Sequence, residues 1–337
     1  MTRLGLSLPL MHPLPLTVHL SLAREAQTLG FDRVWATEIA GPDAMTLMGL
    51  LAAHTSRIGF ATGVVPVQTR TPQVLAMTAA TLGSVAPGRF TLGLGVSSPI
   101  IVGQWHGLPW DRPLERLREA VTLIRLALSG EKVSFEGRHY HCRNFRLSML
   151  PPQPVKIVLG ALGPRMLELA GEIADGVLLN WLPPEAVPAC LSRIEAGAKK
   201  AGRSLADIEV AGFVRTSVTD DIGAARQWLA RDITGYAIVD SYARFFSECG
   251  YTDEIARINA AWQAGDRAGA VAQVSDRFLE GLGAVGSEAF CRDRMAQYAK
   301  AGLTEPVVFP FAAGSDPVPT LFRTVRAFGR EPSRSAS

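Results

Sequence analysis

The sequence lacks the features that would tie it to a membrane or to a nucleic acid. No apolar run in its 337 residues is long enough to span a bilayer, and prolines interrupt residues 9–15, so we expect neither a transmembrane helix nor a signal peptide. The basic residues are scattered and the formal charge is only +3, unlike the clustered basic surface of a nucleic-acid binder. We therefore expect no membrane and no nucleic acid among its partners.

Cysteine is scarce as well, and the four cysteines lie far apart without a Cys-x-x-Cys pair. That spacing argues against a zinc site or a disulfide framework and fits the reducing cytoplasm, where we place the protein. Histidines and carboxylates do not gather at metal-ligand spacing, so we predict no metal. No Gly-x-Ser-x-Gly motif is present, which disfavours a hydrolase with a nucleophile elbow.

Apolar residues, in contrast, are abundant, at 47% of the chain against 19% charged residues, so a large core is possible. Apolar runs predict strands at Leu4–Leu8, Arg33–Ala36, Ile58–Val65, Phe90–Gly95, Val155–Gly160, Gly176–Asn180, Ile208–Val214 and Pro306–Phe311. Helical patterns lie between them, at residues 18–29, 43–55 with Asp43 as N-cap, and 72–86 with Thr71 as N-cap. This alternation predicts a single (β/α)₈ barrel of the α/β class. An open doubly wound sheet is the second possibility, but it would usually divide the chain into two domains.

Two segments are too long to be simple connections, namely residues 96–154 after the fourth strand and 215–304 after the seventh. The first carries a helix at about 111–128 and a hairpin in which Val133–Phe135 would pair with His139–His141. Insertions that follow barrel strands lie at the rim where active sites form, so both are expected to wall or cover a pocket. The second suits oligomer contacts equally well. We expect one domain over residues 1–330 and a flexible tail at 331–337.

A glycine turn between two predicted strands is the most informative motif. The strand ending at Gly160 is followed by Gly163, by Pro164 at a favoured first helical position, and by an amphipathic helix that leads to the strand at Gly176–Asn180. Bare backbone at a helix N-terminus attracts anions such as a cofactor phosphate. The same pattern also occurs as an ordinary βα turn, because a short glycine-rich turn is a weak motif.

Several segments in order resemble one family. They are Phe31–Glu38, Ile58–Val65 followed by Arg70–Pro72, Ala86–Gly95, and Val158–Met166 continuing to Ala174-Asp175-Gly176. Together they resemble the bacterial luciferase-like superfamily of flavin-dependent barrels, and within it the branch that uses the 8-hydroxy-5-deazaflavin coenzyme F420. That branch includes methylenetetrahydromethanopterin reductases and deazaflavin-dependent glucose-6-phosphate dehydrogenases. The resemblance covers about residues 1–214.

The resemblance implies how a cofactor would be held. Thr62, Gly63 and Val64 would form a bulge behind the tricyclic ring, with a cis peptide bond between Gly63 and Val64. Two facing loops would grip the phosphate through backbone N–H groups and serine hydroxyls, with Arg165 adding charge. The implied loop residues are Gly95, Val96, Ser97 and Ser98 in one loop, and Gly160, Ala161, Leu162 and Gly163 in the other.

The resemblance also implies a catalytic residue. Glu38 follows the second strand, where the family places an acid near the ring or the substrate, and it would hold the ring or take part in proton transfer. Ile39 stands where the branch often has His, and Ser98 stands where sugar-phosphate dehydrogenases carry a catalytic Glu. Both differences argue against sugar-phosphate chemistry. Among aromatic residues in rim loops, we expect His12, Trp105 and Trp181 to shape a substrate pocket.

The sequence thus predicts an oxidoreductase that transfers a hydride between coenzyme F420 and a small organic substrate whose identity is not readable. One alternative is a luciferase-like monooxygenase that uses reduced FMN and oxygen. A second is a non-catalytic flavin-binding relative. By analogy with the family we expect a homodimer.

Overall fold

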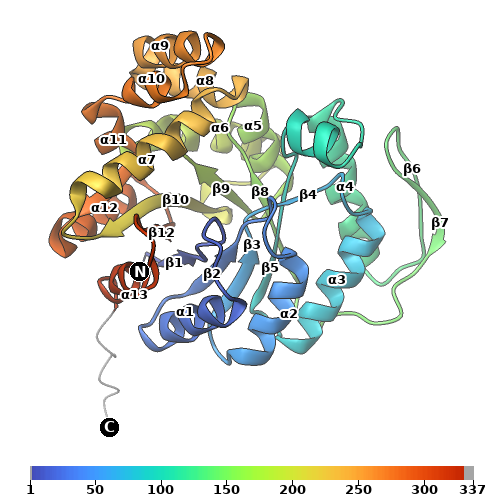
Figure 1. Cartoon of the computed structure of the whole chain (residues 1–337). Helices are drawn as coiled ribbons and strands as arrows, with labels where there is room; N and C mark the ends of the chain where they lie inside the picture. The colour runs from blue at the N-terminus through green and yellow to red at the C-terminus, as the bar shows by residue number, and fades with distance from the viewer. Residues whose placement is uncertain (1, 330–337) are drawn as a thin grey trace.

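Eight parallel strands close into a barrel in the computed structural model, which describes residues 2–329 (Figure 1). In chain order the barrel strands are β1 (Gly5–Ser7), β2 (Arg33–Ala36), β3 (Gly59–Thr62), β5 (Phe90–Gly95), β8 (Lys156–Gly160), β9 (Gly176–Asn180), β10 (Glu209–Val218) and β12 (Glu305–Pro310). Pairing of β9 with β10 and of β12 with β1 completes the ring. The predicted (β/α)₈ barrel is confirmed. The tail expected at 331–337 lies outside the described residues.

An outer ring of helices covers the barrel. It contains α1 (Leu16–Thr28), α2 (Ala44–His54), α3 (Pro72–Val85), α4 (Pro113–Leu128), α5 (Pro164–Ile173), α6 (Val187–Lys200) and α13 (Val318–Arg326). Two predicted N-caps are present: Asp43 accepts a hydrogen bond from the Thr46 N–H at 2.7 Å, and Thr71 accepts one from the Val74 N–H at 3.3 Å. Short 3₁₀ turns, η2 (Pro184–Ala186) and η3 (Leu205–Asp207), flank α6.

The third barrel strand is interrupted, although the sequence predicted it as one run from Ile58 to Val65. After Thr62 the chain leaves the ladder and resumes as β4 (Val65–Pro66), which pairs with β5. The peptide bond between Gly63 and Val64, at this interruption, is cis. This is the bulge that the family resemblance implied.

The hairpin of the first insertion pairs differently from the prediction. Strand β6 (Val133–Glu136) pairs with β7 (His141–Phe145), with Glu136 opposite His141, so residues 139 and 140 belong to the turn. The reason is Glu119 of α4, whose carboxylate accepts hydrogen bonds from the backbone N–H groups of Arg138, His139 and Tyr140 at 2.9, 2.8 and 3.2 Å. Those donors are therefore not available to a strand ladder. The π-helix η1 (Pro99–Trp105) precedes α4 in the same insertion.

The second insertion begins later than predicted, because β10 continues through Val218. It contains α7 (Ile222–Ala237), α8 (Asp240–Phe246), η4 (Ser247–Tyr251), α9 (Thr252–Gln263), α10 (Arg267–Ala272), α11 (Asp276–Leu282), β11 (Gly283–Gly286) and α12 (Glu288–Ala301). Strand β11 extends the sheet beside β10, pairing Arg215–Val218 with Gly283–Gly286. Figure 1 shows α8, α9 and α10 stacked beyond α7 at one end of the molecule, while the β6–β7 hairpin projects on the opposite side.

Ionic side chains occupy one level of the barrel interior. Arg33 lies 3.0 Å from Glu209 and 3.3 Å from Glu305, and the indole N–H of Trp35 donates to Glu305 at 2.7 Å. An apolar cluster of inward side chains belongs to the same barrel strands, consisting of Trp35, Ala61, Val158, Leu178, Ala211, Phe213, Val307 and Phe309. Some of these residues also line the open cavity described below. Within residues 2–329, no helix combines the length and apolar character needed to cross a bilayer.

Candidate active site

A cavity of about 570 Å³ opens at the mouth of the barrel, where the parallel strands end. Loops after several strands contribute to it, and α7 and α8 of the second insertion close one side. Its lining includes Glu38, Gly63, Val64, Gly95, Val96, Ser97, Ser98, Gly160, Ala161, Leu162, Gly163, Asn180, Phe213, Arg215, Arg231, Asp232, Tyr236, Tyr242 and Phe309. This is the end at which barrel enzymes build active sites.

Gly63 and Val64 form part of the cavity floor. A Cβ atom placed on Gly63 would lie 2.8 Å from Phe213 Cζ and 3.1 Å from Trp35 Cε3, so there is no room for a larger residue without displacement of these rings. Thr62, predicted with them, does not line the cavity. It is fully buried, and its hydroxyl exchanges hydrogen bonds of 2.8 Å with the N–H and the carbonyl oxygen of Gly93. Thr62 therefore fixes the strand at the interruption through these hydrogen bonds.

Two glycine loops face the cavity beside this floor. A Cβ atom on Gly95 would lie 2.5 Å from Val64 Cγ2, and one on Gly160 would lie 3.2 Å from the same atom, so the loops pack closely on the floor. The backbone N–H groups of Leu162 and Gly163 donate to no acceptor among residues 2–329. They stand at the N-terminus of the ten-residue helix α5, where the helix dipole favours negative charge. This loop therefore has the donor set of an anion site.

The serines and the arginine of these loops lie in different places. Ser97 adopts a positive φ of 56°, and Ser98 accepts a hydrogen bond from the Ile101 N–H at 3.3 Å, which caps η1. Both line the cavity. Arg165 is exposed and lies outside the lining. An anion in the loop would thus be held mainly by backbone groups.

Glu38 lines the cavity, as expected, but its carboxylate already has partners. Arg70 donates to both oxygens at 2.6 and 2.9 Å, and the Ala44 N–H at the start of α2 donates at 2.9 Å. Arg70 also pairs with Asp43. These contacts hold the β2–α2 loop against the barrel, so the geometry supports a role for Glu38 in shaping the cavity wall.

The three aromatic residues expected in the substrate pocket do not line this cavity. His12 stacks on Trp228 with ring centroids 5.7 Å apart, and burial lowers its pKa. Trp105 is 56% exposed at the end of η1. Trp181 is fully buried, with a positive φ of 57° that directs the chain away from the strand end, and its ring lies against Tyr236. The structure thus places these three residues outside the lining of the central cavity.

Sequence analysis missed a polar wall that faces the glycine loops. The guanidinium carbon of Arg215 lies 3.9 Å from the centroid of the Trp181 ring and 4.1 Å from that of Phe309. Its Nη1 donates to Asn180 Oδ1 at 2.5 Å, and its Nε lies 3.5 Å from Asp232 Oδ2. Asn180 in turn donates to the Tyr242 hydroxyl at 3.0 Å. The available signal was one arginine inside an apolar run, which the prediction had ended at Val214.

Burial dominates the electrostatics of this wall. Desolvation raises the pKa of Asp232, and the charge of Arg215 opposes that shift. Desolvation also raises the pKa of the Tyr236 and Tyr242 hydroxyls. Both tyrosines therefore stay neutral donors at physiological pH, because a phenol begins near pKa 10 and is raised from there.

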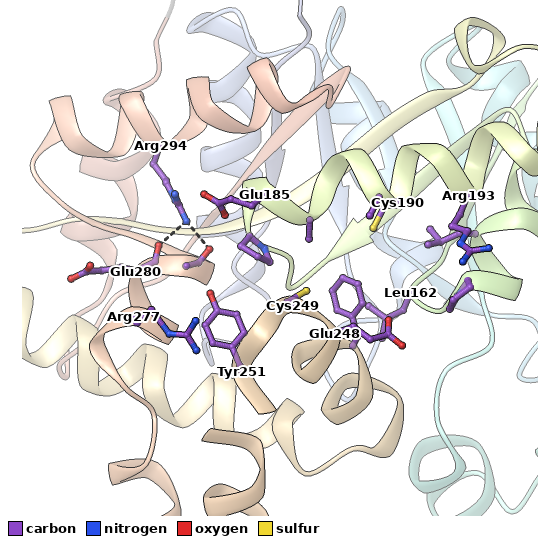
Figure 2. A pocket seen from close by; sticks show the side chains of 17 residues that line it. Leu162, Glu185, Cys190, Arg193, Glu248, Cys249, Tyr251, Arg277, Glu280 and Arg294 are labelled. Atoms are coloured by element: carbon purple, nitrogen blue, oxygen red, sulfur yellow. Dashed lines mark hydrogen bonds between the residues drawn. The ribbon is translucent and has the colours of Figure 1, made fainter. Parts of the chain in front are cut away.

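A second cavity, of about 930 Å³, lies on the other side of the β8–α5 loop, and Leu162 lines both cavities. Figure 2 shows its polar side chains, among which Arg193, Arg277, Glu280 and Arg294 have ion-pair or hydrogen-bond partners. Arg294 donates to the carbonyl oxygens of Glu280 and Gly281 at 2.7 and 2.6 Å, and Arg277 lies 3.1 Å from Glu254. Burial raises the pKa of its Cys190 thiol to about 11. Unreactive thiols and paired charges make this larger cavity the weaker candidate for chemistry.

Within the described part of the chain, no group of three or more His, Cys, Asp or Glu side chains is placed to hold a metal ion. The glycine loops of the central cavity suit an anionic, planar ligand, and its polar wall suits a substrate bound beside that ligand.

Comparisons with known proteins agree with this geometry. The family model described as luciferase-like monooxygenase matches residues 5–305. The chain is 30% identical over 312 residues to a 5,10-methylenetetrahydromethanopterin reductase of Methanolobus tindarius, covering 92% of this chain and 93% of the relative. It is also 30% identical over 327 residues to a putative coenzyme F420-dependent oxidoreductase of Mycobacterium tuberculosis, covering 91% and 94%.

Among solved structures, the coenzyme F420-dependent tetrahydromethanopterin reductase of Methanopyrus kandleri superposes with a TM-score of 0.81 at 27% identity, covering 98% of both chains. The similarity spans the barrel and both insertions, whereas the motifs of the sequence resemblance end at about residue 214.

Proposed function

The chain belongs to the luciferase-like monooxygenase family, and from that premise we propose that it is a coenzyme F420-dependent oxidoreductase that transfers a hydride to or from a small organic substrate. The observation that carries the proposal is the meeting of the Gly63 floor and the two glycine loops in one cavity of about 570 Å³. The predicted family branch and cofactor agree with the relatives, which carry F420 in their names.

The residues present fit such a cofactor. Gly63 and Val64 would support the planar ring from below, since a side chain at Gly63 would meet Phe213 and Trp35. The N–H groups of Leu162 and Gly163, together with Ser97 and Ser98, would hold its phosphate. When bound, the deazaflavin supplies a carbon, position 5, that gives or accepts a hydride. The protein contributes orientation and exclusion of water.

We further propose that the enzyme works as a homodimer in the cytoplasm on a small molecule. All four cysteines are free thiols in the structure, which suits a reducing compartment. Size-exclusion chromatography with light scattering tests the dimer directly.

Cofactor binding tests the central proposal. Titration of the protein with F420 and, separately, with FMN is followed by quenching of tryptophan fluorescence. We expect F420 to bind with a Kd in the micromolar range or below and FMN to bind at least about tenfold more weakly, a difference of about 1.4 kcal/mol. Trp35→Phe should remove part of the quenching, because Trp35 lies directly under the floor. Tight FMN binding without F420 binding would favour the monooxygenase alternative.

A further inference from the structure

The polar wall of the central cavity contains a buried ion pair whose arrangement suits a reaction site. The side chain of Arg215 is 3% exposed and that of Asp232 is 13% exposed, yet both line the central cavity. Charges are costly to bury, and a pair retained at a cavity surface needs a reason beyond stability. Breaking such pairs is destabilising, but apolar replacement of both members is often neutral.

Arg215 is held rigidly from several directions. The Trp181 and Phe309 rings lie on its guanidinium, and Asn180 accepts its hydrogen bond at 2.5 Å. The Tyr242 hydroxyl fixes Asn180 in turn. A cation placed in this way costs no reorganisation when negative charge develops beside it.

Asp232 is held by fewer contacts than Arg215, its partner in the ion pair. Among residues 2–329, Arg215 is the only group that forms an ion pair with its carboxyl. The other titratable or charged groups that line the same cavity are Tyr236 and Arg231 of α7, Tyr242 of α8, and Glu38, which Arg70 neutralises. Asp232 therefore lines the cavity with Arg215 as its ion-pair partner, and a second cation, Arg231, and two phenols line the same wall.

On these contacts, and resting on the proposed function, we propose that Asp232 is the proton donor and acceptor of the reaction, that Arg215 stabilises the charges that develop, and that the substrate is a small aldehyde or ketone, or the corresponding alcohol. Burial, which raises the pKa of Asp232, supports a carboxyl that carries its proton at a pH where an exposed aspartate is ionised.

Reduction of the carbonyl requires one hydride and one proton. A hydride, supplied by the reduced deazaflavin, forms a C–H bond with the carbonyl carbon, and the electron pair of the C=O π bond moves to oxygen. The O–H bond of Asp232 breaks and its proton forms the O–H bond of the alcohol. The carbonyl is reduced and the deazaflavin is oxidised, releasing its second hydrogen to solvent as a proton. Asp232 is left as a carboxylate beside Arg215 and regains a proton from water. Alcohol oxidation is the reverse.

The charge of the wall decides the substrate class. Hydride addition to a carbonyl places negative charge on oxygen, and Arg215 with the neutral Tyr236 hydroxyl favours that charge. A substrate that is cationic at the reacting carbon would be repelled by the same guanidinium. The wall thus favours carbonyl compounds, whose oxygen takes up negative charge, over the methylene group named for the archaeal relatives, which has no carbonyl oxygen.

The first test is kinetic. The protein with reduced F420 is mixed with acetaldehyde, acetone, cyclohexanone, benzaldehyde or methylenetetrahydromethanopterin, and F420 formation is followed in single turnover. With carbonyl substrates, we expect the wild-type rate to fall as pH rises through the pKa of Asp232. Asp232→Asn should lower the rate by about 100-fold or more and flatten that pH profile. Asp240→Asn, which changes an exposed aspartate at the start of the neighbouring helix α8, is the matched control and should behave as wild type.

Two readouts do not depend on turnover. Fluorescence titration should give the Asp232→Asn variant a Kd for F420 within about threefold of the wild-type value, less than about 0.7 kcal/mol. Infrared pH-difference spectra should show a protonated-carboxyl component at a pH where exposed aspartates are ionised, present in the wild type and in Asp240→Asn and missing from Asp232→Asn. Burial also raises the pKa of Glu305, so its band should remain in all three proteins. A wild-type spectrum identical to that of Asp232→Asn would overturn the proton assignment even if no substrate of the panel reacts.

The outcomes separate this inference from the proposed function. Failure of the wild type to bind F420 would refute the proposed function itself. Binding of F420 with an unchanged rate and pH profile in Asp232→Asn would refute only the role of Asp232. Turnover of the pterin substrate with no turnover of the carbonyl compounds would refute only the substrate class.

Discussion

The two sides of the central cavity are built from different chemistry. On one side, glycine loops present backbone N–H groups, and side chains are absent because Val64, Phe213 and Trp35 fill the space they would need. On the other side, the ion pair Arg215–Asp232 and the Tyr236 hydroxyl present ionisable side chains held by buried rings. Different parts of the cavity wall therefore hold the cofactor and choose the reaction. The glycine side should control affinity for the cofactor, and the polar side should control rate and substrate.

The largest effect should come from filling the glycine side. Gly63→Val should weaken F420 binding by more than about 100-fold, roughly 2.7 kcal/mol, because the new methyl groups compete with the Phe213 and Trp35 rings and with the ring of the cofactor. The fold should survive with an overpacking cost of about 1–3 kcal/mol, measured by thermal or urea unfolding. Gly49→Val, at a helical position with open space around it, is the control. Normal F420 affinity in Gly63→Val would contradict the floor assignment.

On the polar side, removal of the cation should slow the reaction without releasing the cofactor. Arg215→Met keeps much of the side-chain length between Trp181 and Phe309 but leaves the Asp232 carboxyl uncompensated, which costs about 1–3 kcal/mol of stability. We expect a rate loss of about 10- to 100-fold, an F420 Kd within threefold of wild type, and a higher pKa for Asp232 in the pH profile. Arg257→Met, an exposed arginine of α9, serves as control. A large loss of F420 affinity in Arg215→Met would mean that the two sides are not separable.

Glu209 lies at the start of β10, away from the central cavity. Contacts with Arg33, Lys156 and Arg3 lower the pKa of Glu209 to about 2, against the opposing effect of burial. Because the pKa of Glu209 is lower in the folded protein, the carboxylate stabilises the fold fully at pH values above 4.5, the pKa in the unfolded chain. This stabilisation is lost as the pH falls from 4.5 toward 2. After allowance for solvent screening, Glu209→Gln should cost about 1–2 kcal/mol at pH 6, and much less at pH 3.

Urea unfolding at both pH values measures this difference. Glu288→Gln, which breaks an exposed pair with Arg292, should change stability by less than about 0.5 kcal/mol at either pH. A cost of Glu209→Gln that does not depend on pH would contradict the assigned pKa. F420 affinity should be unchanged in the folded variant, since Glu209 does not line the central cavity.

The smallest effect is expected at the rim. Arg165 is exposed and does not line the cavity, so Arg165→Gln should weaken F420 binding by less than about threefold at physiological salt. Gly163→Ala should be equally mild, because a Cβ atom there meets nothing within 4 Å and the N–H is retained. Both are measured by the same fluorescence titration. A tenfold loss in Arg165→Gln would show that a side chain, and not the backbone, carries the phosphate.

The glycine side was predictable from the sequence for a physical reason. Gly63, Gly95 and Gly160 are required because the backbone approaches neighbouring atoms closely, and such positions leave a visible pattern in ordered strand and turn motifs. Apolar runs predicted the barrel strands. The largest errors in the predicted strand bounds arose where hydrogen bonds to other elements determine the residue at which a strand ends. Glu119 shortened the hairpin strand, and β11 extended β10 to Val218.

The polar side was not predictable because it depends on tertiary placement. Asp232 lies on a helix that begins after the seventh strand, and nothing local indicates that this helix folds back over the barrel. Trp181 follows a strand end, as a pocket residue should, but its backbone turns the ring behind Arg215. Glu38 was found at the correct place, whereas its pairing with Arg70 depends on two loops that meet only in the fold.

A crystal structure of the protein with F420 tests the division of the cavity most directly. We predict the deazaflavin ring on Gly63–Val64, its phosphate at the N–H groups of Leu162 and Gly163, and one ring face open toward Asp232 and Arg215. A ring bound in the second cavity beside Cys190 and Cys249, or a phosphate held by Arg215, would contradict the account.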